Sequence, residues 1–191
     1  DDTHVYWTNF AAAQEGTGNI KKVLKEGGAS EVFVDGLSGP TSLLRTASGQ
    51  WWWTTFGSAS DGSKGQVMRA SKTGEIELKL GPYPGAPRHL VQPSKGAEDT
   101  VYWLTPGSCL TNPMNPKNDG AVYRFNQGST TNIWSSVACP KMLAPSVNDN
   151  QLYVALEGVN GGGAGVFVWP GLKQWISGSE TVTGLLPSLD D

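Results

Sequence analysis

Short hydrophobic segments rich in aromatic residues recur along this chain, separated by polar turns. Those around Tyr6, Trp52, Tyr102 and Tyr153 follow one another at intervals of about 50 residues. After each comes a variable loop, a second hydrophobic segment that begins at small residues, a polar turn and a further short segment. Pro40, Pro87 and Pro140 each open one more segment, before the next aromatic one. The pattern predicts four short strands per repeat.

This repeat predicts an all-β chain. No stretch carries a sustained helical period, and four-stranded repeats of this length are typical of the blades of a β-propeller. With 25 Gly and 12 Pro, the chain has many residues suited to tight turns, and its 8 Trp suit the packing of sheet on sheet. We therefore expect residues 1–191 to form one propeller domain of four visible blades, with most tryptophans in its core.

The two ends of the chain carry complementary parts of a repeat. Residues 1–4 lead directly into an aromatic strand, whereas residues 184–191 resemble the opening of a blade at 36–43. In one interpretation, the C-terminal segment pairs with the N-terminal blade and closes a four-bladed ring, which removes exposed strand edges. In the other, the chain is a fragment of a longer array, such as a six-bladed propeller.

The first repeat contains a recognisable motif. It combines YWTN at positions 6–9 with GNIKKV at 18–23 and GG at 27–28. This combination resembles the YWTN/YWTD-type repeats of TolB-like and LDL-receptor-like propellers, and similar repeats occur in many secreted bacterial proteins. The resemblance spans nearly the whole chain, but it is close only in the first two repeats. Those propellers usually have six blades, and the Asp that closes their motif is Asn9 and Thr55 here. The resemblance implies a fold and carries over no receptor function.

The two cysteines, Cys109 and Cys139, fall within one repeat. Because strands alternate in direction, the loop that holds Cys109 and the loop that leads to the next blade lie on the same rim. We therefore expect a disulfide between them. It would stabilise the folded protein by ~3 kcal/mol, because it lowers the chain entropy of the unfolded state. Two buried free thiols are the alternative. A disulfide indicates an oxidising compartment, and an initial Asp1 is what signal-peptide removal would leave. We expect a periplasmic or extracellular protein.

Charge excludes several classes of partner. The formal net charge is −3, and only 16% of the residues are charged. There is no basic stripe for nucleic acid, no basic amphipathic helix for a membrane surface, and no hydrophobic run long enough for a transmembrane segment.

Polar residues follow the blade-opening prolines, where the innermost strands are expected to start. In a ring these strands line the central channel, so Arg88, His89 and Lys141 would form a cationic mouth that favours a carboxylate, phosphate or sulfated ligand. The alternative is that Arg88 and Lys141 pair with nearby acids. The predicted ligand-binding residues are Arg88, His89, Lys141, Thr41 and Ser188.

Acidic residues lie in the loops between the second and third strands, one per repeat. Oxygen ligands arranged around a ring could hold Ca²⁺, although single acids in glycine-rich loops are also ordinary turn residues. No other cofactor is expected. The candidate ligands are Glu15, Asp61, Asp119 and Glu157.

Signatures of enzymes are sparse. The chain has no G-x-S-x-G, H-E-x-x-H or Walker motif, and two histidines argue against a His-based metal centre. The loop at 106–119 is stiffened by three prolines and the expected disulfide, which lowers the entropy cost of binding a partner. The sequence therefore favours a non-catalytic exported propeller, a binding or assembly module for a protein or an anionic ligand. A metal-dependent hydrolase of the lactonase or esterase kind and a glycan-binding lectin are the alternatives.

Overall fold

A computed structural model describes residues 1–11, 16–57, 64–83, 85–93, 99–111, 117–146, 151–157, 164–170 and 173–177. Within these residues, the strands form four antiparallel sheets of three or four strands each. In chain order, the sheets contain β1 (His4–Asn9), β2 (Gly18–Leu24) and β3 (Glu31–Leu37); β4 (Pro40–Arg45), β5 (Trp51–Thr55), β6 (Gly65–Ala70) and β7 (Ile76–Tyr83); β8 (Arg88–Val91), β9 (Val101–Thr105), β10 (Gly120–Asn126) and β11 (Ser129–Val137); β12 (Pro140–Pro145), β13 (Leu152–Leu156), β14 (Gly165–Trp169) and β15 (Lys173–Ser177).

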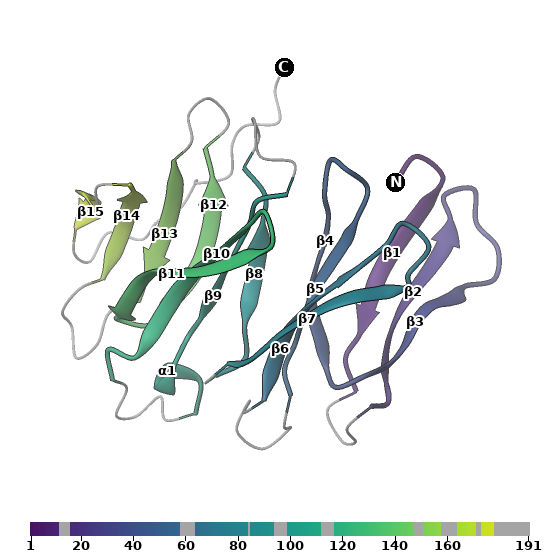
Figure 1. Cartoon of the computed structure of the whole chain (residues 1–191), viewed down its shortest axis with the longest axis horizontal. Helices are drawn as coiled ribbons and strands as arrows, with labels where there is room; N and C mark the ends of the chain where they lie inside the picture. The colour runs from purple at the N-terminus through teal and green to yellow at the C-terminus, as the bar shows by residue number, and fades with distance from the viewer. Residues whose placement is uncertain are drawn as a thin grey trace.

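Each sheet is a meander in which strands adjacent in the chain pair with one another. Figure 1 shows the sheets side by side in an arc, from β1–β3 at one end to β12–β15 at the other. Strand β8 contacts both β4 and β12, so these three are the innermost strands of their sheets. The prediction of an all-β chain built from propeller blades is confirmed. A four-residue helix, α1 (Ser108–Thr111), was not predicted, and it is too short to change the fold class.

Within the described residues, the first sheet has three strands, which correspond to the second, third and fourth strands of the other sheets. Strand β1 corresponds to the second strand of the other sheets, as the aromatic pattern predicted. The segment expected to complete this sheet, residues 184–191, lies outside the described residues. Closure of a ring by that segment therefore stays a prediction.

A contact between glycine and proline joins neighbouring sheets. The third strands β2 and β6 begin at Gly18 and Gly65, beside the prolines that open the next sheet. A Cβ atom on Gly18 would lie 2.5 Å from Cδ of Pro40, and one on Gly65 would lie 2.5 Å from Cδ of Pro87. Only glycine lets the two segments approach this closely, which explains why the repeat pairs a glycine strand start with a proline.

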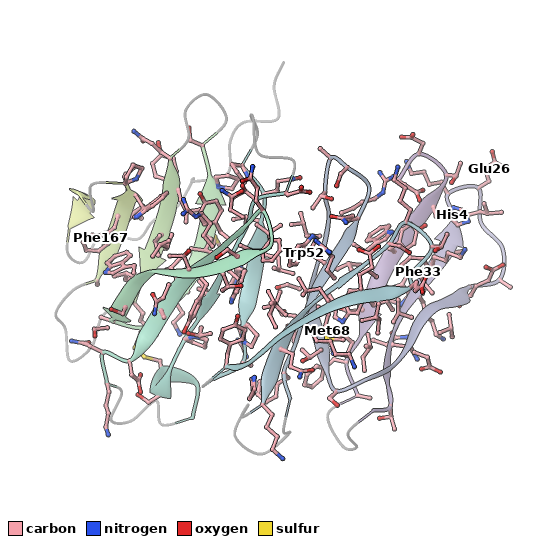
Figure 2. The ribbon with its side chains drawn as sticks, in the orientation of Figure 1. His4, Glu26, Phe33, Trp52, Met68 and Phe167 are labelled. Carbon is pink, nitrogen blue, oxygen red and sulfur yellow. A yellow bond between two sulfur atoms is a disulfide. The ribbon has the colours of Figure 1, made fainter. Side chains whose placement is uncertain are left out.

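Aromatic side chains of the second strands fill the space between the sheets. Trp53 and Trp103 are fully buried, and Trp52 packs against Phe125 of the next sheet with ring centroids 5.0 Å apart. Figure 2 labels Trp52 between the second and third sheets. Burial of large aromatic rings supplies most of the apolar area of such a core. The prediction that these tryptophans belong to the core is correct.

The first sheet leaves one face open. Val5 is 49% exposed, whereas Val101 and Leu152, at the same position of the second strand in later sheets, are 0% and 2% exposed. Val32 on β3 is 51% exposed. In the later sheets the preceding sheet covers this position, so the difference follows from the place of each sheet in the array.

Candidate functional site at the inner strands

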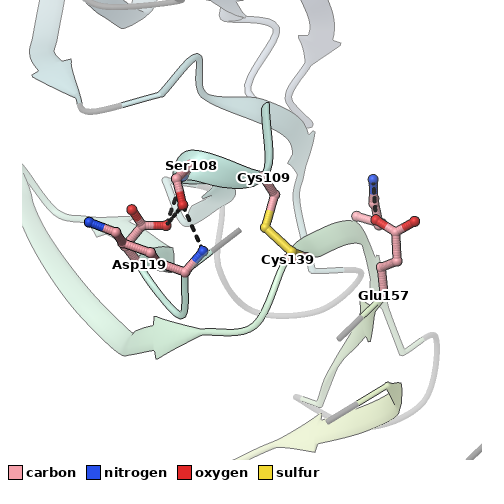
Figure 3. Close-up of a disulfide and its surroundings, with 7 residues drawn as sticks. Ser108, Cys109, Asp119, Cys139 and Glu157 are labelled. Atoms are coloured by element: carbon pink, nitrogen blue, oxygen red, sulfur yellow. Dashed lines mark hydrogen bonds and ion pairs between the residues drawn. A yellow bond between two sulfur atoms is a disulfide. The ribbon is translucent and has the colours of Figure 1, made fainter. Parts of the chain in front are cut away.

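The rim of the third sheet is braced by the predicted disulfide. Cys109 and Cys139 are bonded, with Cα atoms 5.5 Å apart (Figure 3). Cys109 lies in α1, directly after the β9 end, and Cys139 precedes β12. The two loops therefore do share one rim, as the alternation of strand direction predicted.

Hydrogen bonds fix the same loop from its other side. The carboxylate of Asp119 accepts hydrogen bonds from the Ser108 backbone N–H at 2.7 Å and from its hydroxyl at 2.9 Å. The Ser108 hydroxyl oxygen accepts a third bond, from the Lys117 N–H at 2.9 Å (Figure 3). A carboxylate that accepts backbone and hydroxyl donors holds the loop against the start of β10.

The inner strands are irregular directly after their prolines. The strand register shifts between Pro40 and Leu43, between Arg88 and Val91, and in β12 after its first residue. Such bulges redirect side chains away from the regular alternation of a strand. His89 lies inside one of them, with φ of 52°, and its backbone N–H donates to the Ser42 hydroxyl at 2.9 Å. This bond joins β8 to β4.

Thr41, the first of the predicted ligand residues, has partners within the protein. Its hydroxyl lies 2.7 Å from the Thr54 hydroxyl, and its carbonyl oxygen accepts a hydrogen bond from the Thr8 hydroxyl at 3.1 Å. Ser188, predicted at the equivalent position, lies outside the described residues.

Lys141 forms an ion pair on the surface. Its Nζ lies 2.6 Å from Oε2 of Glu157, and the two side chains are 54% and 62% exposed (Figure 3). Glu157 also donates its backbone N–H to the Cys139 carbonyl oxygen at 3.1 Å. For Lys141, the structure therefore shows the alternative that the sequence left open, pairing with a nearby acid.

Arg88 is placed differently from Lys141. Its side chain is half-buried, and its guanidinium carbon lies 5.9 Å from the centroid of the Phe56 ring. Its Nε is buried and has no hydrogen-bond partner, and no described acid forms an ion pair with it. Burial lowers the pKa of Arg88. Burial also lowers the pKa of the neighbouring His89, and the charge of Arg88 lowers it further.

Phe10 and Phe56 lie beside the site but were not predicted from the sequence. Their rings meet edge to face with centroids 5.7 Å apart, and Phe10 is 48% exposed. Each directly follows its aromatic strand, and the Phe56 N–H donates to the Gly39 carbonyl oxygen at 2.7 Å. Their shared position after the first two aromatic strands was the signal that could have found them.

Two of the four candidate calcium ligands, Asp119 and Glu157, lie in the described part of the chain. Asp119 is bonded to Ser108, and Glu157 pairs with Lys141, whereas Glu15 and Asp61 lie outside the described residues. Within the described part of the chain, no cluster of three His, Cys, Asp or Glu side chains is placed to hold a metal ion. The calcium site therefore stays a prediction.

Comparison with known proteins supports the fold. No protein-family profile and no curated protein matches the chain. Its structure is similar to that of a gluconolactonase from Xanthomonas campestris, with a TM-score of 0.56 and 18% sequence identity. The match covers 80% of this chain and 50% of that chain, so the similar part spans half of the gluconolactonase. At this identity the likeness shows the fold alone. In the described residues, no helix has the length and apolar character needed to span a membrane.

Proposed function

We propose that this protein is a non-catalytic, exported β-propeller module that binds an anionic group at Arg88. One observation carries the proposal: the half-buried guanidinium of Arg88 forms no ion pair with any described acid. A half-buried charge without a counterion lacks compensation for its lost hydration, and an anionic ligand would supply it. The planar guanidinium suits a carboxylate or phosphate, to which it donates two parallel hydrogen bonds.

The surroundings of Arg88 favour a ligand with an apolar part beside its charge. Phe56 lies against the guanidinium, and Phe10 extends this aromatic surface towards solvent. Lys141 is exposed and already paired with Glu157. It would therefore contribute to anion binding only through the long-range electrostatic attraction of its charge.

The disulfide supports the exported part of the proposal, because such bonds persist in oxidising compartments. The loop braced by Cys109–Cys139 and Asp119 loses little entropy on contact, which suits a protein partner or a neighbour in an assembly. The resemblance to YWTN/YWTD-type repeats is compatible with a binding role.

Titration with small anions tests the site. Phenylacetate, inorganic phosphate and sulfate are added to the protein in isothermal titration calorimetry, with benzyl alcohol as the neutral counterpart of phenylacetate. We expect phenylacetate to bind best and Arg88→Ala to weaken it at least ~10-fold, the range of a lost charge-assisted hydrogen bond. Lys141→Ala should change the affinity less than ~3-fold, and Lys25→Ala serves as a distant control. Equal binding by Arg88→Ala and the unmodified protein, or no binding of any probe, would overturn the proposal.

Lactone hydrolysis is the second candidate, favoured by the structural likeness to a gluconolactonase. Hydrolysis of glucono-δ-lactone above the uncatalysed rate is measured on the dialysed protein with and without added Ca²⁺, together with its metal content. A stoichiometric bound metal together with metal-dependent hydrolysis would show that the protein is an enzyme rather than a binding module.

A further inference from the structure

A cavity of about 300 Å³ opens between the outer strands of the first and second sheets. Residues from the end of β3 form one side, and residues from β5, β6 and β7 form the other. Its charged residues are Asp35, Lys64 and Lys79. The cavity is separate from Arg88, which begins the inner strand of the third sheet and does not line it.

The backbone of β3 helps to keep this space open. Gly36 has φ of 71°, a conformation that side chains with a Cβ atom rarely adopt, and a Cβ built there would meet nothing within 4 Å. Most of its lining is polar. Leu37 and Met68 are buried beneath the lining, at 3% and 4% exposure, and Ile76 at 38% exposure lies at its edge. The cavity therefore combines a polar, charged lining with one apolar edge.

The charged residues of the cavity form no ion pairs with one another or with other described residues. Within the described part of the chain, Lys22 and Lys141 form ion pairs within 4.0 Å, whereas Asp35, Lys64 and Lys79 form none. One carboxylate and two ammonium groups thus border the same small space without a described ion-pair partner. The excess of one positive charge favours a ligand that is itself an anion.

The neutral polar groups narrow the class of ligand. The Thr55 hydroxyl is occupied, because it accepts a hydrogen bond from the Gln66 backbone N–H at 3.0 Å. The side chains of Gln66 and Ser38 also line the cavity, and the Ser38 oxygen accepts a bond from the Gly16 N–H at 3.2 Å. Asp35 can accept hydrogen bonds from the several hydroxyl groups of a sugar, whereas an inorganic anion offers at most one or two.

We propose that this cavity binds an acidic monosaccharide, such as a hexuronate. Lys64 and Lys79 bind its carboxylate by charge-assisted hydrogen bonds, and Asp35 accepts hydrogen bonds from its hydroxyl groups. The C–H face of the sugar ring packs against Ile76 at the edge of the cavity. A volume of about 300 Å³ is at the lower end of the range for ligand pockets, which suits one sugar ring rather than a chain. This site is additional to the anion site proposed at Arg88.

Titration of the ¹⁵N-labelled protein, followed by NMR, tests whether the cavity binds an acidic monosaccharide. D-glucuronate, D-glucose and inorganic phosphate are added in turn, and amide shifts are followed at residues 35–38 and 64–68. We expect glucuronate to shift these amides and to bind at least ~10-fold more tightly than glucose, the difference made by one charged contact. The double variant Lys64→Gln/Lys79→Gln should lose this preference, while the control Lys25→Gln on the opposite rim should keep it.

A second variant separates an acidic sugar from a plain anion. Asp35→Ala removes a negative charge from the rim, so it should strengthen phosphate binding, yet it should weaken glucuronate binding by removing the acceptor of the hydroxyl groups. If Asp35→Ala strengthens both ligands, or if glucuronate shifts no amide of the cavity, the proposal is overturned. Arg88→Ala should leave glucuronate binding here unchanged, so the failure of one site is distinguishable from the failure of the other.

Discussion

Arg88 and Phe56 belong to neighbouring sheets, and the guanidinium carbon of Arg88 lies 5.9 Å from the centroid of the Phe56 ring. The contact brings a charge from the start of β8 against an aromatic ring just beyond the end of β5. Attraction between a cation and the face of a ring helps to hold a partly buried arginine without a carboxylate partner. The guanidinium is thereby positioned without an ion pair to any described acid.

The first prediction concerns the dependence of stability on pH. Burial and the charge of Arg88 lower the pKa of His89 below its usual value of 6.5. Well above pH 6.5, the His89 ring is neutral in both the folded and the unfolded protein, so it does not change the free energy of unfolding. As the pH falls through 6.5, the unfolded chain binds the proton more readily, so stability decreases until the folded-state pKa is passed. Urea unfolding between pH 5 and 8 should show this loss.

A matched variant checks the origin of that loss. His89→Asn cannot titrate, and asparagine tolerates the left-handed backbone found at this position. It should flatten the decrease below pH 6.5. Arg88→Gln should raise the pKa of His89 towards its usual value, as measured from the shifts of the ring protons by NMR. Identical pH curves for His89→Asn and the unmodified protein would contradict the prediction.

The second prediction concerns the disulfide. Replacement of Cys109 and Cys139 by serine should lower the free energy of unfolding by ~3 kcal/mol, because the unfolded chain regains the entropy of a loop closed across 30 residues. Chemical denaturation measures the difference. Reduction of the unmodified protein serves as the control and should produce a loss of the same size; a reduced protein as stable as the oxidised one would rule out this role.

The third prediction compares equivalent positions in two sheets. Leu152→Ala should destabilise the protein by about 2–5 kcal/mol, since its side chain is 2% exposed between the third and fourth sheets. Val5→Ala, at the same position of the first sheet and 49% exposed, should change stability by less than about 0.5 kcal/mol. Equal losses in thermal or urea unfolding would mean that the face bearing Val5 is covered in solution.

The fourth prediction tests the glycine–proline contact. Gly65→Ala would place a Cβ atom 2.5 Å from Cδ of Pro87 and 2.9 Å from the Thr55 carbonyl oxygen. Overpacking of this kind costs about 1–3 kcal/mol. Thr131→Ala on an exposed outer strand is the control and should be nearly neutral. A Gly65→Ala variant as stable as Thr131→Ala would show that the two sheets separate without cost.

The fifth prediction concerns Lys141 and Glu157. Both side chains are more than half exposed, so solvent and salt screen their attraction despite the separation of 2.6 Å. A double-mutant cycle with Lys141→Ala and Glu157→Ala should give a coupling energy below about 1 kcal/mol. The coupling should weaken further in 1 M NaCl. A larger, salt-independent value would contradict the assignment of a surface ion pair.

Much of the architecture could be predicted from local sequence. The alternation of aromatic strands, polar turns and blade-opening prolines predicted the position of nearly every strand, because strand formation and turn chemistry depend on neighbouring residues. The disulfide was predictable for a related reason: the direction of successive strands places Cys109 and Cys139 on one rim whatever the details of packing.

The candidate site was predicted less completely. The sequence placed Thr41, Arg88 and Lys141 at equivalent positions, and could not tell that Lys141 is paired while Arg88 contacts an aromatic ring. The irregular register after each proline and the partners of Asp119 could not be predicted from the sequence either. Both depend on contacts between segments far apart in the chain.

The sequence by itself thus determined the repeat, the strand order within each sheet and the bridge between the two cysteines, since local propensity and strand direction are enough to specify them. Only the tertiary structure decided which charges are paired, that the Val5 face of the first sheet is open, and that Asp35, Lys64 and Lys79 border one cavity. Those features arise where one sheet packs on the next, and the fit between two packed surfaces is not encoded in the pattern of either one alone.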